Sequence, residues 1–149
     1  MANEERIIVC DTEKCSGCKI CEYACAVFNR KSLNPREAKI IVVRKEPILN
    51  VAISCVLCKT KDCLNGCPTQ AITFNQNKSS IEINADKCDA CGLCIERCKF
   101  GCITMAAQGK NMLVCDFCSG QDSQKCVELC PKGALAYSKP DYFQAKVRQ

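Results

Sequence analysis

The sequence contains no histidine and no tryptophan, and aromatic residues make up only 5% of its 149 residues. Without histidine, the chain cannot form Ser-His or Cys-His nucleophile pairs, histidine general bases, histidine-ligated haem or mixed Cys/His zinc sites. Large aromatic side chains are too few to fill most of an interior. Most routes to hydrolytic catalysis are therefore closed, and we expect something other than large apolar side chains to occupy the core.

Long hydrophobic runs are also missing. The longest purely aliphatic run, Ile40–Val43, is four residues, which is too short to span a membrane. The first ten residues, MANEERIIVC, lack the features of a secretory or twin-arginine signal. We therefore expect no direct membrane insertion and a cytoplasmic location, with export on a signal-bearing partner left open. In a reducing compartment, dense cysteine binds metal more often than it forms disulfides.

Cysteine is what the sequence has in excess. There are 18 cysteines, and sixteen of them fall into four groups of four. Group one is Cys15, Cys18, Cys21 and Cys25; group two is Cys55, Cys58, Cys63 and Cys67; group three is Cys88, Cys91, Cys94 and Cys98; group four is Cys115, Cys118, Cys126 and Cys130. Groups one and three have the spacing C-x2-C-x2-C-x3-C, which is typical of a [4Fe-4S] site in bacterial ferredoxins. Groups two and four are stretched between their second and third cysteines, and both end in Cys-Pro.

The compact spacing has a physical reason. Two residues between ligands allow a tight loop to present three thiolates to three corners of one iron-sulfur cube. We expect the fourth cysteine to lie on the first turn of a short helix, to point away, and to serve the other cluster of a pair. The sixteen cysteines are therefore candidate ligands of four [4Fe-4S] clusters.

Three other interpretations fit less well. A disulfide framework needs an oxidising compartment. Structural zinc usually uses two C-x2-C pairs separated by a dozen or more residues, whereas here three cysteines fall within seven residues twice. A redox sensor with a single cluster would need four cysteines rather than sixteen.

The net charge of +5 would suggest a nucleic-acid partner if it were taken alone. The 21 lysines and arginines are scattered, however, and no run of four or more occurs, so we expect no nucleic-acid binding. The formal charge also counts every thiol as neutral. Sixteen thiolates with four iron-sulfur cores would lower the net charge by about eight, to about −3.

The groups form an internal repeat, because group one resembles group three and group two resembles group four. Apolar stretches that read as strands precede groups one and three, at 6–10 and 80–84, and follow groups two and four, at 71–74 and 134–137. The polar sequence NQNKSS predicts a hairpin between groups two and three. The leading and trailing strands of the chain could complete a second such unit, and GCITM with NMLVC could form another hairpin.

We therefore predict an α+β fold of duplicated two-cluster ferredoxin-like units, with short strands and short helices around four iron-sulfur clusters. The expected organisation is one unit at 1–28 plus 110–140, a second at 50–109, a strand-rich insertion at 29–49 and a tail at 141–149. The insertion either covers a cluster, meets a partner or simply connects the units, and the tail either docks on a partner or frays. Cys10 and Cys102 lie outside the groups and are expected to be small buried hydrophobes.

The order of compact and stretched groups resembles the four-cluster iron-sulfur subunits of the dimethyl sulfoxide reductase and formate dehydrogenase type. The stretches CSGCKICEYAC, CVLCKTKDCLNGCPTQAI, DKCDACGLCIERC and CDFCSGQDSQKCVELCPKGAL match that family's pattern in order. The short length and the segment NPREAKI are similar to small members that accompany tungsten-pterin aldehyde oxidoreductases. One departure is CKFGCI, where Lys99 stands in place of the family's usual proline. The resemblance therefore implies that the flexible, charged side chain of Lys99 lies beside a cluster, where it would alter the reduction potential of that cluster.

The resemblance also implies how the cysteines are shared, because in this family groups one and four hold two clusters together and groups two and three hold two more. We name the four implied ligand sets after their first members. The Cys15 set is Cys15, Cys18, Cys21 and Cys130; the Cys115 set is Cys115, Cys118, Cys126 and Cys25; the Cys55 set is Cys55, Cys58, Cys63 and Cys98; the Cys88 set is Cys88, Cys91, Cys94 and Cys67. The unpaired leading and trailing strands point to the same sharing.

No Walker loop, G-x-G-x-x-G motif or other catalytic constellation is present. We therefore predict a non-catalytic electron-transfer subunit that relays single electrons. Its expected partners are a large catalytic oxidoreductase subunit, of the tungsten- or molybdenum-pterin aldehyde oxidoreductase type, and a soluble ferredoxin or another redox subunit. Two alternatives remain at this point: a free, diffusible polyferredoxin, and a metal-dependent structural or sensing module that transfers no electrons.

Overall fold

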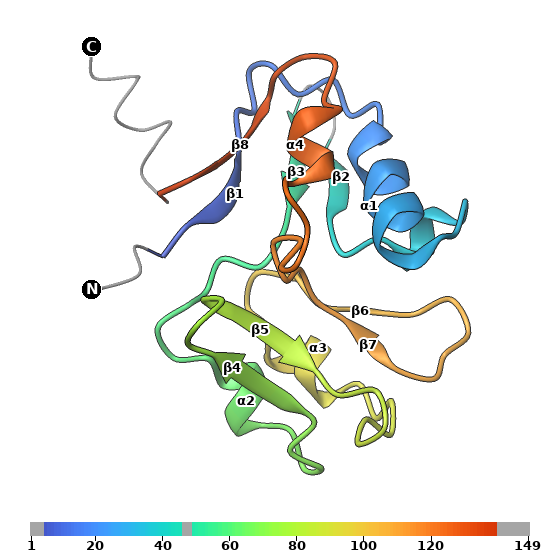
Figure 1. The fold of residues 1–149 in the computed structure, drawn as a ribbon, viewed down its shortest axis with the longest axis vertical. Helices are drawn as coiled ribbons and strands as arrows, with labels where there is room; N and C mark the ends of the chain where they lie inside the picture. The colour runs from blue at the N-terminus through green and yellow to red at the C-terminus, as the bar shows by residue number, and fades with distance from the viewer. Residues whose placement is uncertain (1–4, 46–48, 140–149) are drawn as a thin grey trace.

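The computed structural model describes residues 5–45 and 49–139 as a small α+β fold of short helices and two-stranded antiparallel sheets (Figure 1). The expected tail at 141–149 lies outside the described residues. No helix in this part of the chain combines the length and hydrophobicity needed to cross a membrane.

The first and last described strands pair with each other. Strand β1 (Ile7–Cys10) runs antiparallel to β8 (Leu135–Ser138), and the apolar residues of β1 are buried. Helix α1 (Ile20–Arg30), which follows β1, packs against α4 (Lys125–Glu128), which precedes β8 (Figure 1). The predicted pairing of the leading and trailing strands is confirmed.

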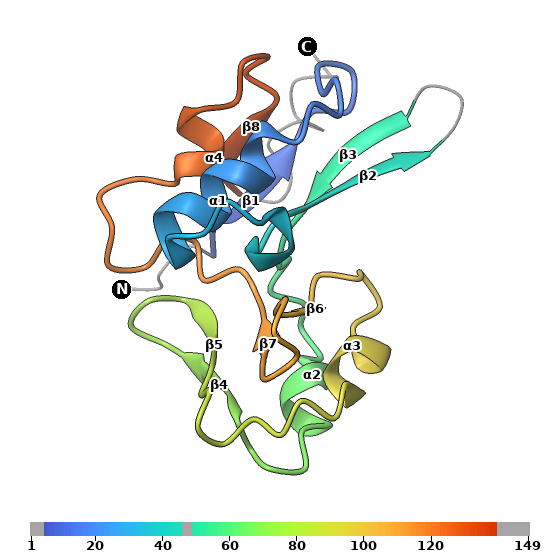
Figure 2. The ribbon, with the colours of Figure 1, turned by 90° about the vertical axis from the view of Figure 1, so that its right-hand side faces the viewer.

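We call β1, β8, α1 and α4 the first assembly. A second assembly lies below it in Figures 1 and 2. Strand β4 (Ile72–Asn75) runs antiparallel to β5 (Ser80–Ile83), as the sequence predicted, and α2 (Asp62–Asn65) packs against α3 (Leu93–Arg97). The side-chain Oδ1 of Asn75 accepts the backbone N–H groups of Asn77 and Lys78 and so closes the turn of the hairpin.

Two further hairpins complete the fold. Strand β2 (Ile41–Lys45) pairs with β3 (Leu49–Ile53), and the short strands β6 (Thr104–Met105) and β7 (Met112–Leu113) form the hairpin expected between groups three and four. Figure 2 shows β2 and β3 reaching out beside β1 and α1, with β6 and β7 between the two assemblies. A short 3-10 helix, Pro35–Glu37, links α1 to β2.

Two buried carboxylates hold these pieces together. Glu22 of α1 accepts the backbone N–H of Val42 in β2, at 2.7 Å. Glu37 accepts both the guanidinium of Arg30, at 3.1 Å, and the backbone N–H of Ala107 in the loop between β6 and β7, at 2.7 Å. Because hydrogen bonds to charged groups are stronger than neutral ones, each carboxylate fixes one element against its neighbour.

Cysteine contributes a large share of the interior. Nine of the described buried side chains are cysteines, whereas Phe117 is the one buried aromatic among the described residues. Its ring stacks on Tyr137 of β8, with centroids 5.7 Å apart. The expectation that large aromatic side chains do not fill the core is therefore confirmed.

The turn between the first and second cysteines shares one backbone feature in all four groups. The residue directly before the second cysteine is left-handed in each case, and these residues are Gly17, Leu57, Ala90 and Phe117, with φ between 48° and 67°. Such a residue turns successive backbone N–H groups toward one side and makes a concave surface that favours anions, including iron-sulfur sites.

Three of these four positions carry a side chain, so the left-handed backbone alone does not require glycine at position 17. The requirement comes from packing, because the β2–β3 hairpin lies against this turn. Arg44 donates from Nε and from its terminal nitrogen to the carbonyl oxygen of Gly17. A Cβ atom at position 17 would lie 2.7 Å from Asn50 Oδ1 and 2.9 Å from Arg44 Nε.

We expect Gly17→Ala to displace Arg44 and to lower the free energy of unfolding by about 1–3 kcal/mol, because a charge-assisted hydrogen bond is lost. The measurement is thermal unfolding of the iron-loaded protein. Gly133→Ala is the matched control, since Gly133 is also left-handed, at φ +59°, but a Cβ there would contact nothing. Equal destabilisation by the two substitutions would contradict the packing argument.

Candidate iron-sulfur centres

The third cysteine of every group occupies the second position of a helix. Cys21, Cys63, Cys94 and Cys126 follow the first residues of α1, α2, α3 and α4, and all four are buried. The backbone N–H of the residue after each of these cysteines donates to the carbonyl oxygen three residues earlier, for example Glu22 to Lys19 and Leu64 to Lys61. The positive end of the helix dipole lies at this first turn and favours a negatively charged thiolate.

The expected position of the fourth cysteine on the first turn of a helix is wrong. Cys98 directly follows α3, whereas Cys67 and Cys130 come two residues after the last residues of α2 and α4, and Cys25 lies in the middle of the longer α1. In groups two, three and four the rest of the short helix therefore separates the third cysteine from the fourth, whereas in group one both lie on α1, one turn apart. This separation allows the fourth thiol to face a different group of cysteines from the first three.

Four cysteines gather at one end of the first assembly. Cys15, Cys18, Cys21 and Cys130 line one pocket together with Pro131 and Lys132, among other residues. The pKa of the Cys21 thiol is raised to about 12, chiefly by burial and further by Cys130 and Cys15 nearby. Three cysteines of group one and the last of group four therefore lie together.

A second gathering includes Cys25, which lies one helical turn after Cys21 on α1. The thiol of Cys115 is close enough to those of Cys126 and Cys25 for their charges to interact, and Cys126 is similarly close to Cys25, to Cys118 and, with a smaller effect, to Cys21 of the first gathering. Burial raises the pKa of Cys115 and of Cys126 well above the ordinary range of a thiol. Cys25 also accepts the backbone N–H of Lys39, with 3.2 Å between nitrogen and sulfur.

The second assembly contains two more gatherings. Cys55 interacts with Cys63, Cys98 and Cys58, and Cys94 interacts with Cys88, Cys67 and Cys91. Burial raises the pKa of both Cys55 and Cys94 to about 11. As in the first assembly, three thiols of one group are neighbours of the fourth thiol of another.

The chemistry of these sites fits [4Fe-4S] clusters. Crowded buried thiols with raised pKa values keep their protons unless cations replace those protons. Iron that binds to the thiolates would replace and release them. Among the described residues, no three Cys, Asp or Glu side chains are arranged to hold a single metal ion. In a cube, each thiolate binds a different iron atom, so its ligands do not converge on one point.

The two cysteines outside the groups differ in their surroundings. Cys102 is buried as expected, and its thiol donates to the carbonyl oxygen of Ser54 at 2.9 Å, while its backbone N–H donates to Cys98 Sγ. Cys10 is only half-buried; it lies near Cys15 and Cys130 and accepts the backbone N–H of Ala52. Neither belongs to the predicted ligands.

Three further residues around the cysteine motifs are Lys99, which the sequence analysis named, and Asn29 and Lys39, which it did not. Lys99 is 74% exposed, and its Nζ lies 3.7 Å from Asp62 Oδ2. Sequence reasoning missed Asn29 and Lys39, which contact Cys25 from outside the cysteine motifs. The one signal in the sequence is that Asn29 follows Cys25 by four residues, which places it one helical turn away.

Comparison with known proteins agrees with this chemistry. Residues 47–99 match the 4Fe-4S dicluster domain family. The "Aliphatic sulfonate oxidoreductase, polyferredoxin-like subunit" of Pyrococcus furiosus is 36% identical over 129 residues, which cover 85% of this chain and 73% of that protein. The "Putative electron transport protein YsaA" of Escherichia coli is 33% identical and covers 87% of each chain.

A solved structure shares the fold. The BamBC active-site complex of benzoyl coenzyme A reductase with benzoyl-CoA contains a chain that superposes with a TM-score of 0.53 at 22% identity, over 97% of both chains. The relatives and the cysteine geometry lead to the same assignment. This chain belongs to the ferredoxin-type iron-sulfur subunits that transfer electrons in oxidoreductases.

Proposed function

We propose that this electron-transfer subunit holds four [4Fe-4S] clusters, one in each of the Cys15, Cys115, Cys55 and Cys88 sets. One observation carries the proposal: each gathering of thiols contains three cysteines of one group and the fourth of another. Ferredoxins that bind two clusters share ligands in this crossed manner.

We further infer a duplicated architecture with units at 1–28 plus 110–140 and at 50–109, joined by the segment 29–49 and followed by the tail 141–149. The two assemblies support this inference by their parallel construction. In each, the strand before a compact group pairs with the strand after a Cys-Pro group, as β5 pairs with β4 and β1 with β8. In each, two helices that carry third cysteines also pack together.

The chain itself is non-catalytic, and we propose that it relays single electrons between a large catalytic oxidoreductase subunit and a soluble ferredoxin or another redox subunit. Bound clusters supply one-electron redox centres. The Pyrococcus furiosus relative is named as a subunit of an oxidoreductase, which supports a catalytic partner for this chain. The resemblance of its motifs favours a partner of the tungsten- or molybdenum-pterin aldehyde oxidoreductase type.

The surface of α1 favours a bound subunit over the alternative, a free polyferredoxin. Ile20, Tyr23, Val27 and Phe28 of this helix are each 36–49% exposed, and an apolar patch of this kind is typical of an interaction surface. The same helix contributes cysteines to two of the proposed ligand sets. Stable co-purification with a catalytic subunit would distinguish the two alternatives.

The cluster count predicts the composition of the protein. Anaerobically purified chain should contain about 16 iron atoms and about 16 acid-labile sulfides, because four cubes each hold four of both. Elemental analysis with a sulfide assay measures this content. Zinc in place of iron, or about 12 iron atoms in fully loaded protein, would contradict the assignment of at least one group.

The crossed sharing of ligands predicts which substitutions act alike. Cys25→Ser should disturb the same electron paramagnetic resonance signal as Cys115→Ser, because both residues belong to the Cys115 set. The signal that is lost in Cys15→Ser should remain. If Cys25→Ser instead disturbed the signal of group two, the groups would pair in sequential order and the proposed sets would be wrong.

The relay itself can be tested in the complex. The isolated chain should turn over no small substrate, yet adding it to its catalytic subunit should speed electron delivery to an external acceptor. Cys63→Ser should lower that rate and leave the half-reaction of the catalytic subunit with its substrate unchanged. Lys78→Gln, in an exposed ion pair with Glu82, is the control. Delivery that is indifferent to Cys63→Ser would contradict a series relay.

A further inference from the structure

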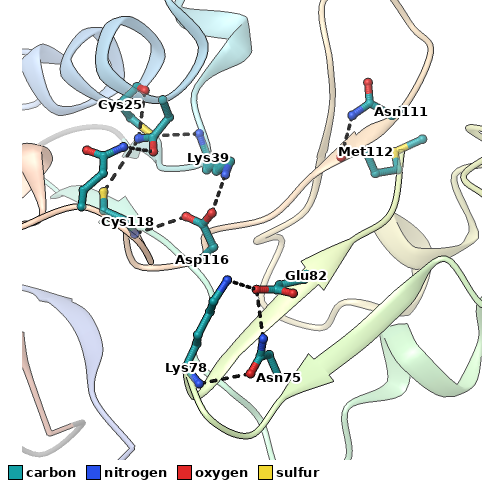
Figure 3. A network of polar contacts seen from close by, with 11 residues as sticks. Cys25, Lys39, Asn75, Lys78, Glu82, Asn111, Met112, Asp116 and Cys118 are labelled. Atoms are coloured by element: carbon teal, nitrogen blue, oxygen red, sulfur yellow. Dashed lines mark hydrogen bonds and ion pairs between the residues drawn. The ribbon is translucent and has the colours of Figure 1, made fainter. Parts of the chain in front are cut away.

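The side chain of Asn29 is directed at two thiols of the Cys115 set. Asn29 lies in the last turn of α1, and its Nδ2 donates to the carbonyl oxygen of Cys25 at 3.1 Å. The same nitrogen lies 3.6 Å from Cys25 Sγ and 3.8 Å from Cys118 Sγ, within the range of hydrogen bonds to sulfur. Figure 3 shows Cys25 and Cys118 facing one another in this network.

The orientation of the amide is fixed by its neighbours. Gln121 Nε2 donates to Asn29 Oδ1 at 3.0 Å. If the Asn29 amide were reversed, its oxygen would face the Cys25 carbonyl oxygen, and two acceptors would be in contact. The N–H side of the amide therefore faces the thiols.

The ammonium group of the neighbouring Lys39 already has a carboxylate partner. Lys39 Nζ forms an ion pair with Asp116 Oδ2 at 2.8 Å, and both side chains are mostly buried (Figure 3). Only the backbone N–H of Lys39 donates to Cys25 in the contacts described above. The Asn29 amide thus acts on the thiols as an uncharged donor that bridges two segments of the chain, α1 and the loop after β7.

Hydrogen bonds to the sulfurs are one of the factors that set the reduction potential of an iron-sulfur centre. A donor stabilises the thiolates more when the centre carries an additional electron, because the negative charge on sulfur is then larger. The potential consequently rises with each donor.

We propose that Asn29 raises the reduction potential of the centre held by Cys115, Cys118, Cys126 and Cys25. This inference rests on the proposed ligand set and adds a residue that tunes it. Asn29 binds no iron; it positions N–H dipoles at two of the ligands and so makes this centre a more favourable place for an electron in the relay.

The test is a redox titration of the complete iron-loaded chain, followed by electron paramagnetic resonance. Asn29→Leu removes the donor and keeps a side chain that branches at the same atom. At a fixed solution potential, the ratio of reduced to oxidised centre should fall about tenfold, which corresponds to about 59 mV for a one-electron couple. Asn29→Ala, which also favours the helix, should give a shift in the same direction.

Asn111→Leu is the matched control, because Asn111 Nδ2 donates to the carbonyl oxygen of Met112 and not to a thiol (Figure 3). It should leave all potentials unchanged. Cys118→Ser identifies which signal belongs to the Cys115 set. An unchanged potential in both Asn29 variants, or an equal shift in Asn111→Leu, would overturn the proposed role of Asn29 and leave the proposed ligand set intact. If Cys25→Ser and Cys118→Ser disturbed different signals, the ligand set would be wrong and this inference would fall with it.

Discussion

The fold depends on offsetting the repulsion between thiolates that it brings together. Nine buried cysteines lie in a chain whose elements are short, and burial together with neighbouring thiols raises the pKa of Cys21 to about 12 and that of Cys55 to about 11. Two-stranded sheets and helices of one turn are marginally stable by themselves in water. Sulfur–iron bonds supply what this small apolar core lacks, because each one removes a proton and fixes a piece of backbone at the same time.

If the proposed ligand sets hold, each assembly would fold as a single cooperative unit. The cysteine near the start of a short helix belongs to one gathering and the cysteine just after the helix belongs to another, as with Cys94 and Cys98 of α3. Losing one site therefore removes support from the helix that also serves its neighbour. The carboxylates of Glu22 and Glu37 extend this coupling to the hairpins outside the cysteine motifs.

Spacing and repetition predicted the strands, the NQNKSS hairpin and the pairing of β1 with β8, because alternation and turn residues act locally and two strands without partners need each other. Spacing did not predict where helices begin. The spacing limits how far each thiol can reach, but it does not decide where in a helix the cysteine lies. The expected position of the fourth cysteine on the first helical turn was therefore wrong. Asn29 and Lys39 were missed because their contacts with Cys25 depend on how α1 packs against segments distant in sequence.

The pairing of β1 with β8 has a consequence for how the chain is made. Residues 7–10 leave the ribosome long before residues 135–138, whereas groups two and three are complete much sooner. Domains begin to form during synthesis, and contacts between distant residues form slowly. Under the proposed ligand sets, the second assembly could therefore bind its clusters on the nascent chain, whereas the first could not be completed until β8 is translated. The first assembly is thus the last part of the described fold that synthesis can complete.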